Sequence, residues 1–373
     1  MIFILLFSTL LALPYLLVVT LCLGASHKRK HIALGVDDSA LTAERLTVLV
    51  PFRNEGTNLF ALLDDLKEQS LDSNCFDVVL INDHSEDNFL KKWELRRTEY
   101  SLNMQLIHLP KGKTGKKQAV LEGLRNTKTD WVIQTDADCR VPKRWLSMVI
   151  REFRLGSDLV LGVVKMVPQS NFWSRFAALE FMSLQAVGWA FARLGKPIMG
   201  SAASMAYSKS MLEMLTLGGA DQRSGDDVFL IQAVAAHPKL RCSFLPFDAA
   251  VTTPATNSLK DLINQRSRWG AKTPSYTSTL AITVACSLVL ITGLLLFLGL
   301  AMPWFGLKMA CPFLLVFGLK TSLDYILLRK FSSFTNQIFL LKNYLVSTLV
   351  YPFYLGLTLV SMLLVKPVWK QRK

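Results

Sequence analysis

The stretch LTVLVPFRNEGTNLFALLDDLKEQSLDSNCFDVVLIND, residues 46–83, sets the fold of the middle of this chain. It begins and ends with short runs rich in apolar and β-branched residues (46–52 and 76–83), and the residues between them have helical periodicity. Two further strand candidates follow at 105–109 and 131–136, again separated by helix-like segments. This alternation predicts an α/β domain built on a parallel sheet with right-handed crossovers.

Polar and acidic residues follow three of these strand candidates. They are RNE (53–55), DHSED (83–87) and DAD (136–138). A solvated turn would explain any one of them, but the carboxyl ends of parallel strands meet at one edge of a sheet, where α/β proteins bind ligands. The paired carboxylates of Asp136 and Asp138 suit a Mg²⁺ or Mn²⁺ ion that also binds the phosphates of a substrate.

Two common phosphate-binding motifs are missing. No Gly-x-Gly-x-x-Gly follows the first strand candidate, which argues against NAD or FAD. The GKT at 112–114 resembles the end of a P-loop, but the earlier glycine that this motif requires is replaced by Ile107. What remains is a nucleotide diphosphate held by a metal ion and side chains.

Both ends of the chain are apolar, and 51% of all residues are hydrophobic, with a mean hydropathy of +0.32. Residues 2–23 carry no charge and are followed directly by basic residues, which indicates an uncleaved membrane anchor rather than a signal peptide. A second apolar block contains candidate spans at 280–301, 309–328 and 344–365. The sequence therefore predicts a membrane-tethered globular domain.

The net charge of +14 is concentrated beside the apolar segments and in KGKTGKK (111–117). Basic flanks suit anionic lipid headgroups, and the internal cluster suits a phosphorylated small molecule. We expect no nucleic-acid partner, because basic patches with interleaved aromatic residues are missing. The six cysteines show neither metal-ligand spacing nor a disulfide framework, which fits a reducing compartment.

Six ordered elements carry a family resemblance. They are VLVPFRNE (48–55), VVLINDHSED (78–87), GKKQAVLEGL (115–124), DAD (136–138), GDD (225–227) and QRSRW (265–269). In this order and spacing the chain resembles, over residues 45–275, the membrane-bound inverting glycosyltransferases of family 2, a group that includes cellulose, chitin and hyaluronan synthases and ceramide glucosyltransferase. The resemblance implies a GT-A-type, Rossmann-like mixed sheet in a catalytic domain flanked by transmembrane helices.

The resemblance also implies roles on the nucleotide side of the site. Phe52, Asn54 and Glu55 would shape the nucleoside pocket. Asp83 would bind the base, which is usually uracil in this group, and Lys116 would approach the nucleotide. Asp136 would face the ribose and diphosphate, and Asp138, together with Asp136, would coordinate the divalent metal ion.

On the acceptor side, Asp227 would be the general base that deprotonates the acceptor hydroxyl. Gln265, Arg268 and Trp269 match the Gln-x-x-Arg-Trp motif and, with Asp226, would line the diphosphate and acceptor side. Direct displacement by the acceptor inverts the anomeric centre, so the enzyme needs no nucleophile of its own. The alternative for Asp227 is an ordinary acid in the first turn of a helix.

Two departures from the family pattern keep the required acids. The nucleotide motif reads Asn82-Asp83 rather than Asp-Asp, and the base motif reads Gly-Asp-Asp rather than Glu-Asp. A third departure is size, because about four spans leave little protein for a translocation channel. A single transfer to a lipid-linked acceptor is therefore favoured over chain synthesis.

We expect six segments along the chain. They are an N-terminal transmembrane helix (1–25), a basic linker (26–44), a GT-A glycosyltransferase domain (45–255), an amphipathic interfacial helix with QRSRW (256–278), a C-terminal transmembrane region of about three spans (279–366) and a basic tail (367–373). If all three C-terminal spans cross, the basic tail lands outside, against the positive-inside tendency. One of them would then be interfacial or re-entrant, with 331–343 the segment most easily misassigned.

The predicted function is metal-assisted transfer of a sugar from a nucleotide-diphosphate sugar, expected to be a UDP-sugar, to a lipid-linked or glycan acceptor. The enzyme would be integral to the inner or plasma membrane, in contact with membrane lipids, with its catalytic domain cytoplasmic and with room for partner membrane subunits. Two alternatives remain: a subunit of a processive polysaccharide synthase, and a non-catalytic protein that binds nucleotide sugars. A transporter is excluded because Asp324 is almost the only charge within the spans.

Overall fold

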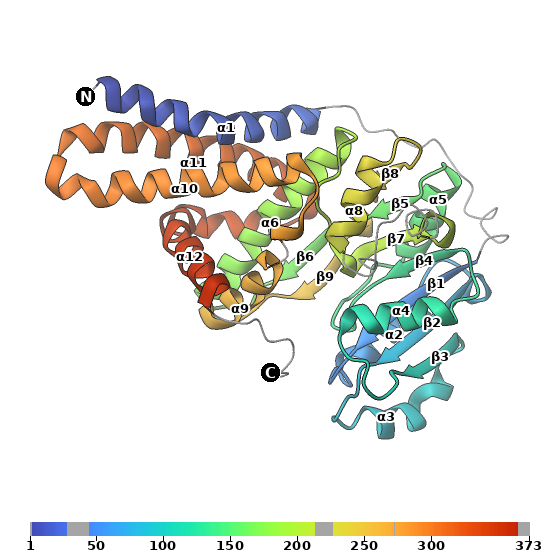
Figure 1. Ribbon diagram of the computed structural model, residues 1–373. Coiled ribbons are helices and arrows are strands. Elements are labelled where there is room, and N and C mark those ends of the chain that lie inside the picture. Colours follow the sequence, from blue (N-terminus) through green and yellow to red (C-terminus); the bar gives the residue numbers. More distant parts are fainter. Residues whose placement is uncertain (1, 28–44, 213–226, 272, 365–373) are drawn as a thin grey trace. The chain divides into compact units, whose positions relative to one another are not determined.

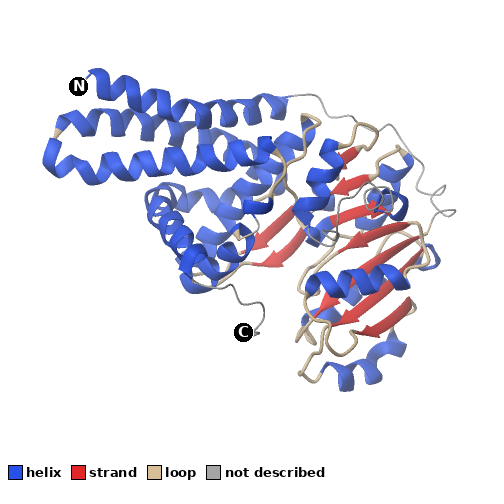
Figure 2. Ribbon diagram, viewed as in Figure 1, coloured by secondary structure: helices blue, strands red, loops and turns tan. Residues whose placement is uncertain are grey.

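The computed structural model describes residues 2–27, 45–212, 227–271 and 273–364. The chain divides into two compact units, each described by itself below (Figure 1). The helical unit comprises residues 1–28, 168–191 and 255–373, and the sheet unit comprises residues 29–167 and 192–254. Figure 2 shows the strands in red.

The sheet unit contains every strand and several short helices. In chain order these are β1 (Leu46–Phe52), α2 (Asn58–Lys67), β2 (Phe76–Asn82), α3 (Phe89–Arg96), β3 (Asn103–His108), α4 (Lys116–Asn126), β4 (Trp131–Gln134), α5 (Trp145–Arg154), β5 (Leu159–Leu161), β6 (Val164–Val167), β7 (Met205–Ser208), α8 (Asp227–Ala236), β8 (Cys242–Phe244) and β9 (Val251–Pro254). Single 3₁₀ turns are η2 (Ser73–Cys75), η3 (Arg97–Glu99), η4 (Ala202–Ser204) and η5 (Phe247–Ala249). The first four strands correspond to the four strand candidates of the sequence.

Seven strands form one sheet in the order β3-β2-β1-β4-β7-β5-β8, and β6 pairs with β9 in a small second sheet. The first four strands are parallel to one another, but β7 is antiparallel to both β4 and β5. The sheet is therefore mixed, as the family resemblance implied. Strand-helix alternation alone predicts a parallel sheet, and it fails at β7 because this strand is not reached by a simple crossover from β4.

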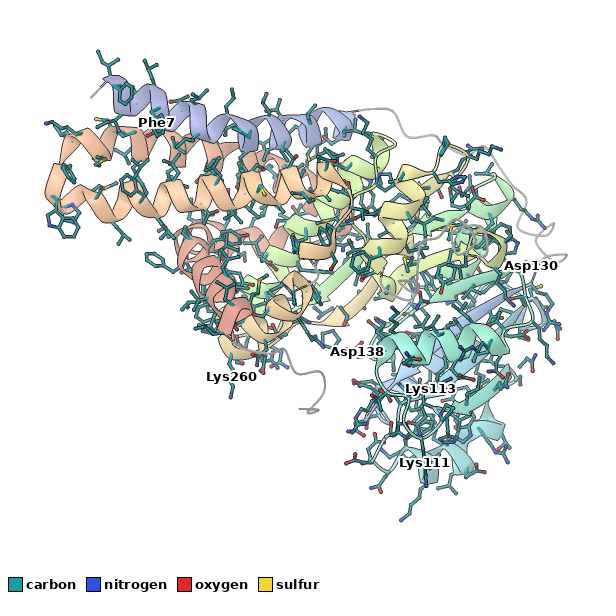
Figure 3. The ribbon with its side chains drawn as sticks, in the orientation of Figure 1. Phe7, Lys111, Lys113, Asp130, Asp138 and Lys260 are labelled. Atoms are coloured by element: carbon teal, nitrogen blue, oxygen red, sulfur yellow. The ribbon has the colours of Figure 1, made fainter. Side chains whose placement is uncertain are left out.

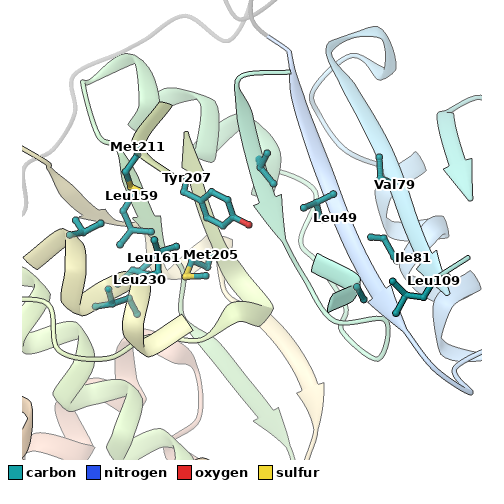
Figure 4. Close-up of a cluster of buried hydrophobic side chains, with 14 residues drawn as sticks. Leu49, Val79, Ile81, Leu109, Leu159, Leu161, Met205, Tyr207, Met211 and Leu230 are labelled. Carbon is teal, nitrogen blue, oxygen red and sulfur yellow. The ribbon is translucent and has the colours of Figure 1, made fainter. Parts of the chain in front are cut away.

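Both faces of the sheet are covered at its centre, since all seven residues of β1 are buried. Helix α4 packs against β1 and β2, and Gly123 permits its close approach. A Cβ atom at Gly123 would lie 2.9 Å from Ile81 Cδ1 and 3.1 Å from Leu49 Cδ2. Figure 4 shows the core on this sheet, which includes the buried Tyr207. The Tyr207 hydroxyl donates a hydrogen bond to Gln134 Oε1 at 3.0 Å.

The helical unit consists of long helices and two shorter connections. These are α1 (Ile2–His27), α6 (Phe172–Arg193, whose last two residues belong to the sheet unit), α9 (Leu259–Gly270), η6 (Thr273–Ser275), α10 (Thr279–Phe305), α11 (Leu307–Thr335), η7 (Ile338–Asn343) and α12 (Tyr344–Leu364).

Among the described residues, four helical segments are long and apolar enough to cross a membrane: 2–26, 279–305, 307–335 and 338–364. An α-helix needs roughly 20 residues to span the hydrocarbon core. Apolar side chains on these helices point outward, for example Trp304, which is 77% exposed. Such a surface is unfavourable in water and suits a lipid environment. These four segments match the number of spans expected from the sequence.

Helices α1, α10 and α11 share an apolar core that includes Ala12, Ile291 and Val316. The same helices hold a small polar network. The Tyr15 hydroxyl donates to Asp324 Oδ1 at 2.9 Å, and Lys320 Nζ lies 2.6 Å from Asp324 Oδ2. Asp324, the charge singled out in the sequence, therefore has a cationic partner one helical turn away, which is how charges inside apolar spans are usually satisfied.

The segment 331–343 combines the end of a helix with a connection. Helix α11 ends at Thr335, where Asn336 takes a left-handed conformation with φ +58°, a common way to end a helix. The 3₁₀ turn η7 follows and leads directly into α12. The three C-terminal helices are therefore joined by short connections.

We expect the stability of the sheet unit to depend on the β5 side of its core. Leu161→Ala should lower the free energy of unfolding by about 2–5 kcal/mol, because it leaves a cavity among buried side chains. Leu155→Ala, at a position that is 45% exposed, is the matched control and should change it by less than about 0.5 kcal/mol. Denaturant unfolding of the purified protein measures both. Equal losses would contradict the core assignment.

Candidate active site

The polar clusters after β1 and β2 interlock. Asn54 and His84, which follow the two parallel strands, both have positive φ angles, 54° and 52°. The Asn54 amide donates to Ser85 Oγ at 2.9 Å, and the Glu86 amide donates to Asn54 Oδ1 at 2.8 Å. Strained backbone of this kind persists only where surrounding contacts fix it, and it often marks a functional loop. The sequence prediction that these two clusters meet at one sheet edge is confirmed.

Arg53 fastens the same two loops. Its Nη1 donates to the Asp83 carbonyl at 3.2 Å, and its Nη2 lies 2.9 Å from Glu86 Oε1. Phe52 is buried, with its ring 4.6 Å from the ring of Phe89. It can therefore shape a pocket only by supporting the loop from the core.

Glu55 lies beside the first turn of α2. Its Oε2 accepts a hydrogen bond from Asn58 Nδ2 at 2.7 Å. This contact holds the carboxylate at the end of the β1 loop, in the neighbourhood that the sequence assigned to it.

Asp83 is completely buried, with 0% of its surface exposed. Its Oδ2 accepts the backbone N–H of Gly115 at 3.0 Å, and so caps the N-terminus of α4, where a negative charge is favourable. The neighbouring His84 Nε2 lies 3.1 Å from the Lys113 carbonyl oxygen. The segment 110–115 therefore contacts the end of β2, where Asp83 is closed off from solvent.

Gly115 has φ +98° and ψ 156°, a conformation that is essentially restricted to glycine. This backbone geometry places its N–H toward Asp83 and starts α4 at the next residue. The GKK of the sequence motif is thus a structural junction as well as a source of positive charge.

Lys116, the first residue of α4, forms an ion pair with Asp136 in the loop after β4. Burial lowers the pKa of Lys116, but the Asp136 carboxylate and, in addition, Asp227 raise it above its usual value. Lys116 therefore stays charged at neutral pH. Residues from α4, the β4 loop and α8 therefore interact electrostatically, and we refer to Lys116, Asp136 and Asp227 as the charged cluster.

Asp136 and Asp138 both lie in the loop after β4, because this strand ends at Gln134 and not at Asp136 as expected. The loop turns tightly, with the Cys139 amide donating to the Asp136 carbonyl at 3.0 Å. Beyond it, the Arg140 amide donates to the Thr252 carbonyl at 2.8 Å and the Thr252 amide to the Arg140 carbonyl at 2.9 Å. The loop that carries the two acids is thereby anchored at its far end. Figure 3 labels Asp138.

The donor atoms of this loop fit a hard divalent ion. Within the described ranges, no group of three or more His, Cys, Asp and Glu side chains could enclose a metal, so two carboxylates would need ligands from water and a substrate. Mg²⁺ is commonly bound in this way, through one or two carboxylates and substrate phosphates. Burial, followed by Asp136 and Asp138, raises the pKa of the neighbouring Cys139 thiol.

Asp227 is the first described residue of α8. Its Oδ1 accepts the Val228 amide at 3.0 Å, and its Oδ2 accepts the amide of Ala202, in η4 before β7, at 3.3 Å. The first of these contacts is local to the start of the helix. The coupling to Lys116 shows that the same carboxylate also belongs to the charged cluster. Asp226 lies outside the described residues.

Gln265, Arg268 and Trp269 lie on α9 in the helical unit. This helix begins at a Ser258 cap, whose Oγ accepts the Asp261 amide at 3.1 Å. Its buried face, around Leu262, packs against α6 and α12. That face therefore makes the contacts of an ordinary packed helix, while Lys260 and Asn264 are exposed.

Sequence reasoning missed the residue that holds two members of this motif. Arg266, at an unassigned motif position, donates from Nη1 to Gln265 Oε1, and its guanidinium carbon lies 4.1 Å from the centre of a Trp269 ring. It pairs with Glu180 of α6. The sequence feature that could have indicated a buried basic partner is Glu180, the one acidic residue of the largely apolar helix α6.

The sheet unit is a mixed α/β fold with acids and a lysine at its carboxyl edge, and the same chain carries helices long and apolar enough to cross a membrane. Comparison with known families agrees. The "Glycosyl transferase family 2" model matches residues 47–213, and the "Glycosyl transferase family group 2" model matches residues 131–365, more than half of the chain. The chain belongs to the family 2 glycosyltransferases and is an enzyme of the transferase class.

Two solved structures were compared with this chain. The mannosyltransferase PcManGT from Pyrobaculum calidifontis, in complex with GDP-Man and Mn²⁺, is 18% identical with a TM-score of 0.61, and the match covers 97% of this chain and 99% of that one. TarS 1–349 from S. aureus, in complex with UDP-GlcNAc, is 18% identical with a TM-score of 0.40, covering 82% of this chain and 91% of that one. The first likeness shows a shared GT-A fold.

We expect Gly115→Ala to destabilise the sheet unit by about 1–3 kcal/mol, because alanine cannot adopt this backbone conformation without strain. Gly318→Ala, in the interior of α11 with no atom within 4 Å of the added methyl group, is a control of the same chemistry and should be neutral or stabilising. Thermal unfolding followed by circular dichroism compares the two. A neutral Gly115→Ala would mean that the junction tolerates other conformations.

Proposed function

We propose that this enzyme transfers a sugar from a nucleotide-diphosphate sugar, expected to be a UDP-sugar, to a lipid-linked or glycan acceptor, with inversion at the anomeric carbon. The observation that carries the proposal is the cluster of Lys116, Asp136 and Asp227 beside the interlocked loops of β1 and β2. It combines a fixed cation for phosphate, carboxylates for a metal ion and a carboxylate for proton transfer.

On the donor side, Asn54 and Glu55 would border the nucleoside, with Phe52 supporting them from the core. Asp83 would bind the base once the segment 110–115 moves aside. Lys116 would contact the phosphates, and the N-terminus of α4 adds a favourable dipole for anions.

Asp136 and Asp138 would hold Mg²⁺ or Mn²⁺. When bound, such an ion would neutralise the charge that develops on the leaving diphosphate. In the absence of substrate, Lys116 balances Asp136, and we infer that it turns toward the phosphates when they bind. The presence of GDP-Man and Mn²⁺ in the related mannosyltransferase fold supports a nucleotide diphosphate with a divalent ion. It also means that GDP-sugars must be tested beside UDP-sugars.

On the acceptor side, Asp227 would take the proton of the acceptor hydroxyl while the oxygen attacks the anomeric carbon and the bond to the diphosphate breaks. Arg268 would stabilise the departing diphosphate, with Gln265, Trp269 and Asp226 lining the same side. The first-turn hydrogen bond from Val228 would keep the Asp227 carboxylate oriented.

We further propose that the segments 1–25 and 279–366 anchor the enzyme in the inner or plasma membrane, with 26–44 as a basic linker and 367–373 as a basic tail. The GT-A domain, residues 45–255, would face the cytoplasm, and 256–278 would lie at the membrane surface. Four candidate spans favour a single transfer over export of a polymer, unless partner membrane subunits contribute a channel.

The catalytic roles are tested by two variants. Asp227→Asn should lower kcat by about 10²–10⁴-fold while leaving donor affinity unchanged, because it removes the proton acceptor. Asp138→Asn should raise the Mn²⁺ concentration needed for half-maximal activity, and chelator should abolish wild-type activity. Nucleotide release across a panel of UDP- and GDP-sugars, with crude lipid extract as acceptor, measures both.

Asp130→Asn, a conservative change outside the cluster, is the control for these variants and should retain full activity. If no donor turns over while nucleotides still bind, the non-catalytic alternative replaces the proposed function.

The product distribution separates the two enzymatic alternatives. We expect one product size, since each acceptor would receive one sugar and then dissociate. Chromatography of radiolabelled product over time measures this. A ladder of lengths that persists when the acceptor is in large excess over the enzyme would identify a processive synthase subunit instead.

A further inference from the structure

Within the helical unit, Glu180 of α6 and Arg266 of α9 form a buried ion pair. Their side chains are 8% and 6% exposed. Arg266 Nε lies 2.9 Å from Glu180 Oε2 and 3.2 Å from Oε1, and Arg266 Nη2 lies 2.5 Å from Oε2. Two guanidinium nitrogens therefore meet both carboxylate oxygens, the geometry in which arginine gives most directional control.

The same guanidinium reaches two members of the Gln-x-x-Arg-Trp motif. It donates to Gln265 Oε1 at 2.5 Å, and its carbon lies 4.1 Å from the centre of a Trp269 ring. One residue of α9 is thus fixed by α6 and in turn contacts the motif residues on either side of it. A pair that only stabilised the unit would need neither of these further contacts.

Burying an ion pair is a poor way to gain stability, because removing two charges from water offsets much of their attraction. Apolar residues of similar volume would hold α6 and α9 together as well. What an apolar contact lacks is direction. The planar guanidinium fixes the orientation of α9 about its own axis, and with it the orientation of the Gln265 amide and the Trp269 ring.

We propose that Glu180 and Arg266 are positioning residues for sugar transfer: the pair holds Gln265 and Trp269 in the orientation in which they act on the diphosphate and the acceptor. This inference rests on the proposed function for the role of the motif, but the physical contact between the pair and the motif does not. Misplacement of a positioned group by about 1 Å can reduce the rate about 100-fold.

The decisive variant removes both charges at once. A single substitution leaves an unpaired buried charge and can simply unfold the protein, whereas Glu180→Leu/Arg266→Met leaves apolar side chains that can pack. We expect this double variant to unfold at a temperature close to that of wild type. Its kcat for transfer should nevertheless fall about 100-fold, with the Kd for the donor nucleotide unchanged. Arg266→Lys, which keeps the charge but loses the planar contacts, should show an intermediate kcat.

The helical unit provides a matched control in Lys320 and Asp324, a second largely buried pair, with side chains 10% and 14% exposed. Lys320→Met/Asp324→Leu removes the same charges from α11, where Lys320 contacts Asp324 and the rings of Tyr15 and Tyr351. We expect its kcat to match wild type, although its unfolding temperature should be somewhat lower because the Tyr15 hydroxyl loses its acceptor Asp324. Equal losses of kcat in the two double variants would overturn the proposal, because they would reflect a general requirement for buried pairs.

A second readout does not depend on turnover. Hydrogen–deuterium exchange of the peptide covering 259–270 should become faster in Glu180→Leu/Arg266→Met, while peptides from α10 and α11 keep wild-type exchange. If wild type turns over no donor, the proposed function fails, but faster exchange still shows that the pair holds the motif. Unchanged exchange, or faster exchange with wild-type kcat, would overturn the positioning role.

Discussion

The site depends on Gly115 and Lys116 at the start of α4, because these adjacent residues bind two acids that follow different strands. The Gly115 N–H binds the buried Asp83 carboxylate, and the Lys116 side chain pairs with Asp136. Because β1 lies between β2 and β4 in the sheet, one helix terminus connects loops that the sheet itself keeps apart. Gly115 supplies the backbone conformation that binds Asp83, and Lys116 supplies the charge that pairs with Asp136. We therefore expect replacement of either residue to displace the acid that it binds.

The strands and helices around this site could be predicted from the sequence because each has a local signal. The apolar run at 46–52 forms β1 with the same bounds, and helices α2, α3 and α4 lie between the strand candidates, where helix-like segments were expected. The antiparallel β7 could not be predicted from local pattern, because its direction is set by pairing with β4 and β5, far away in the sequence. Its place in a mixed sheet came only from the family resemblance.

The candidate site was predictable as a set of acids but not as a set of contacts. The motifs named Asp83 and Asp136, yet no spacing rule shows that Asp83 is fully enclosed or that Lys116 balances Asp136. Those facts follow from tertiary contacts made by loops. Arg266 was missed for the same reason: the motif leaves its position open, and its contacts with Gln265 and Trp269 follow from the folded structure.

Charge is handled differently in the two units, and the difference follows from solvent. In the sheet unit, Lys116 and Asp136 remain partly exposed, so water can compensate either group when a substrate takes its partner. In the helical unit, Glu180 and Arg266 are almost fully buried, and an exchange of partners would leave an uncompensated charge in an apolar surrounding. The first pair is therefore suited to being opened by a ligand during each turnover. The second is suited to keeping one geometry throughout, which is the property required of a support for groups that must meet the acceptor in a fixed orientation.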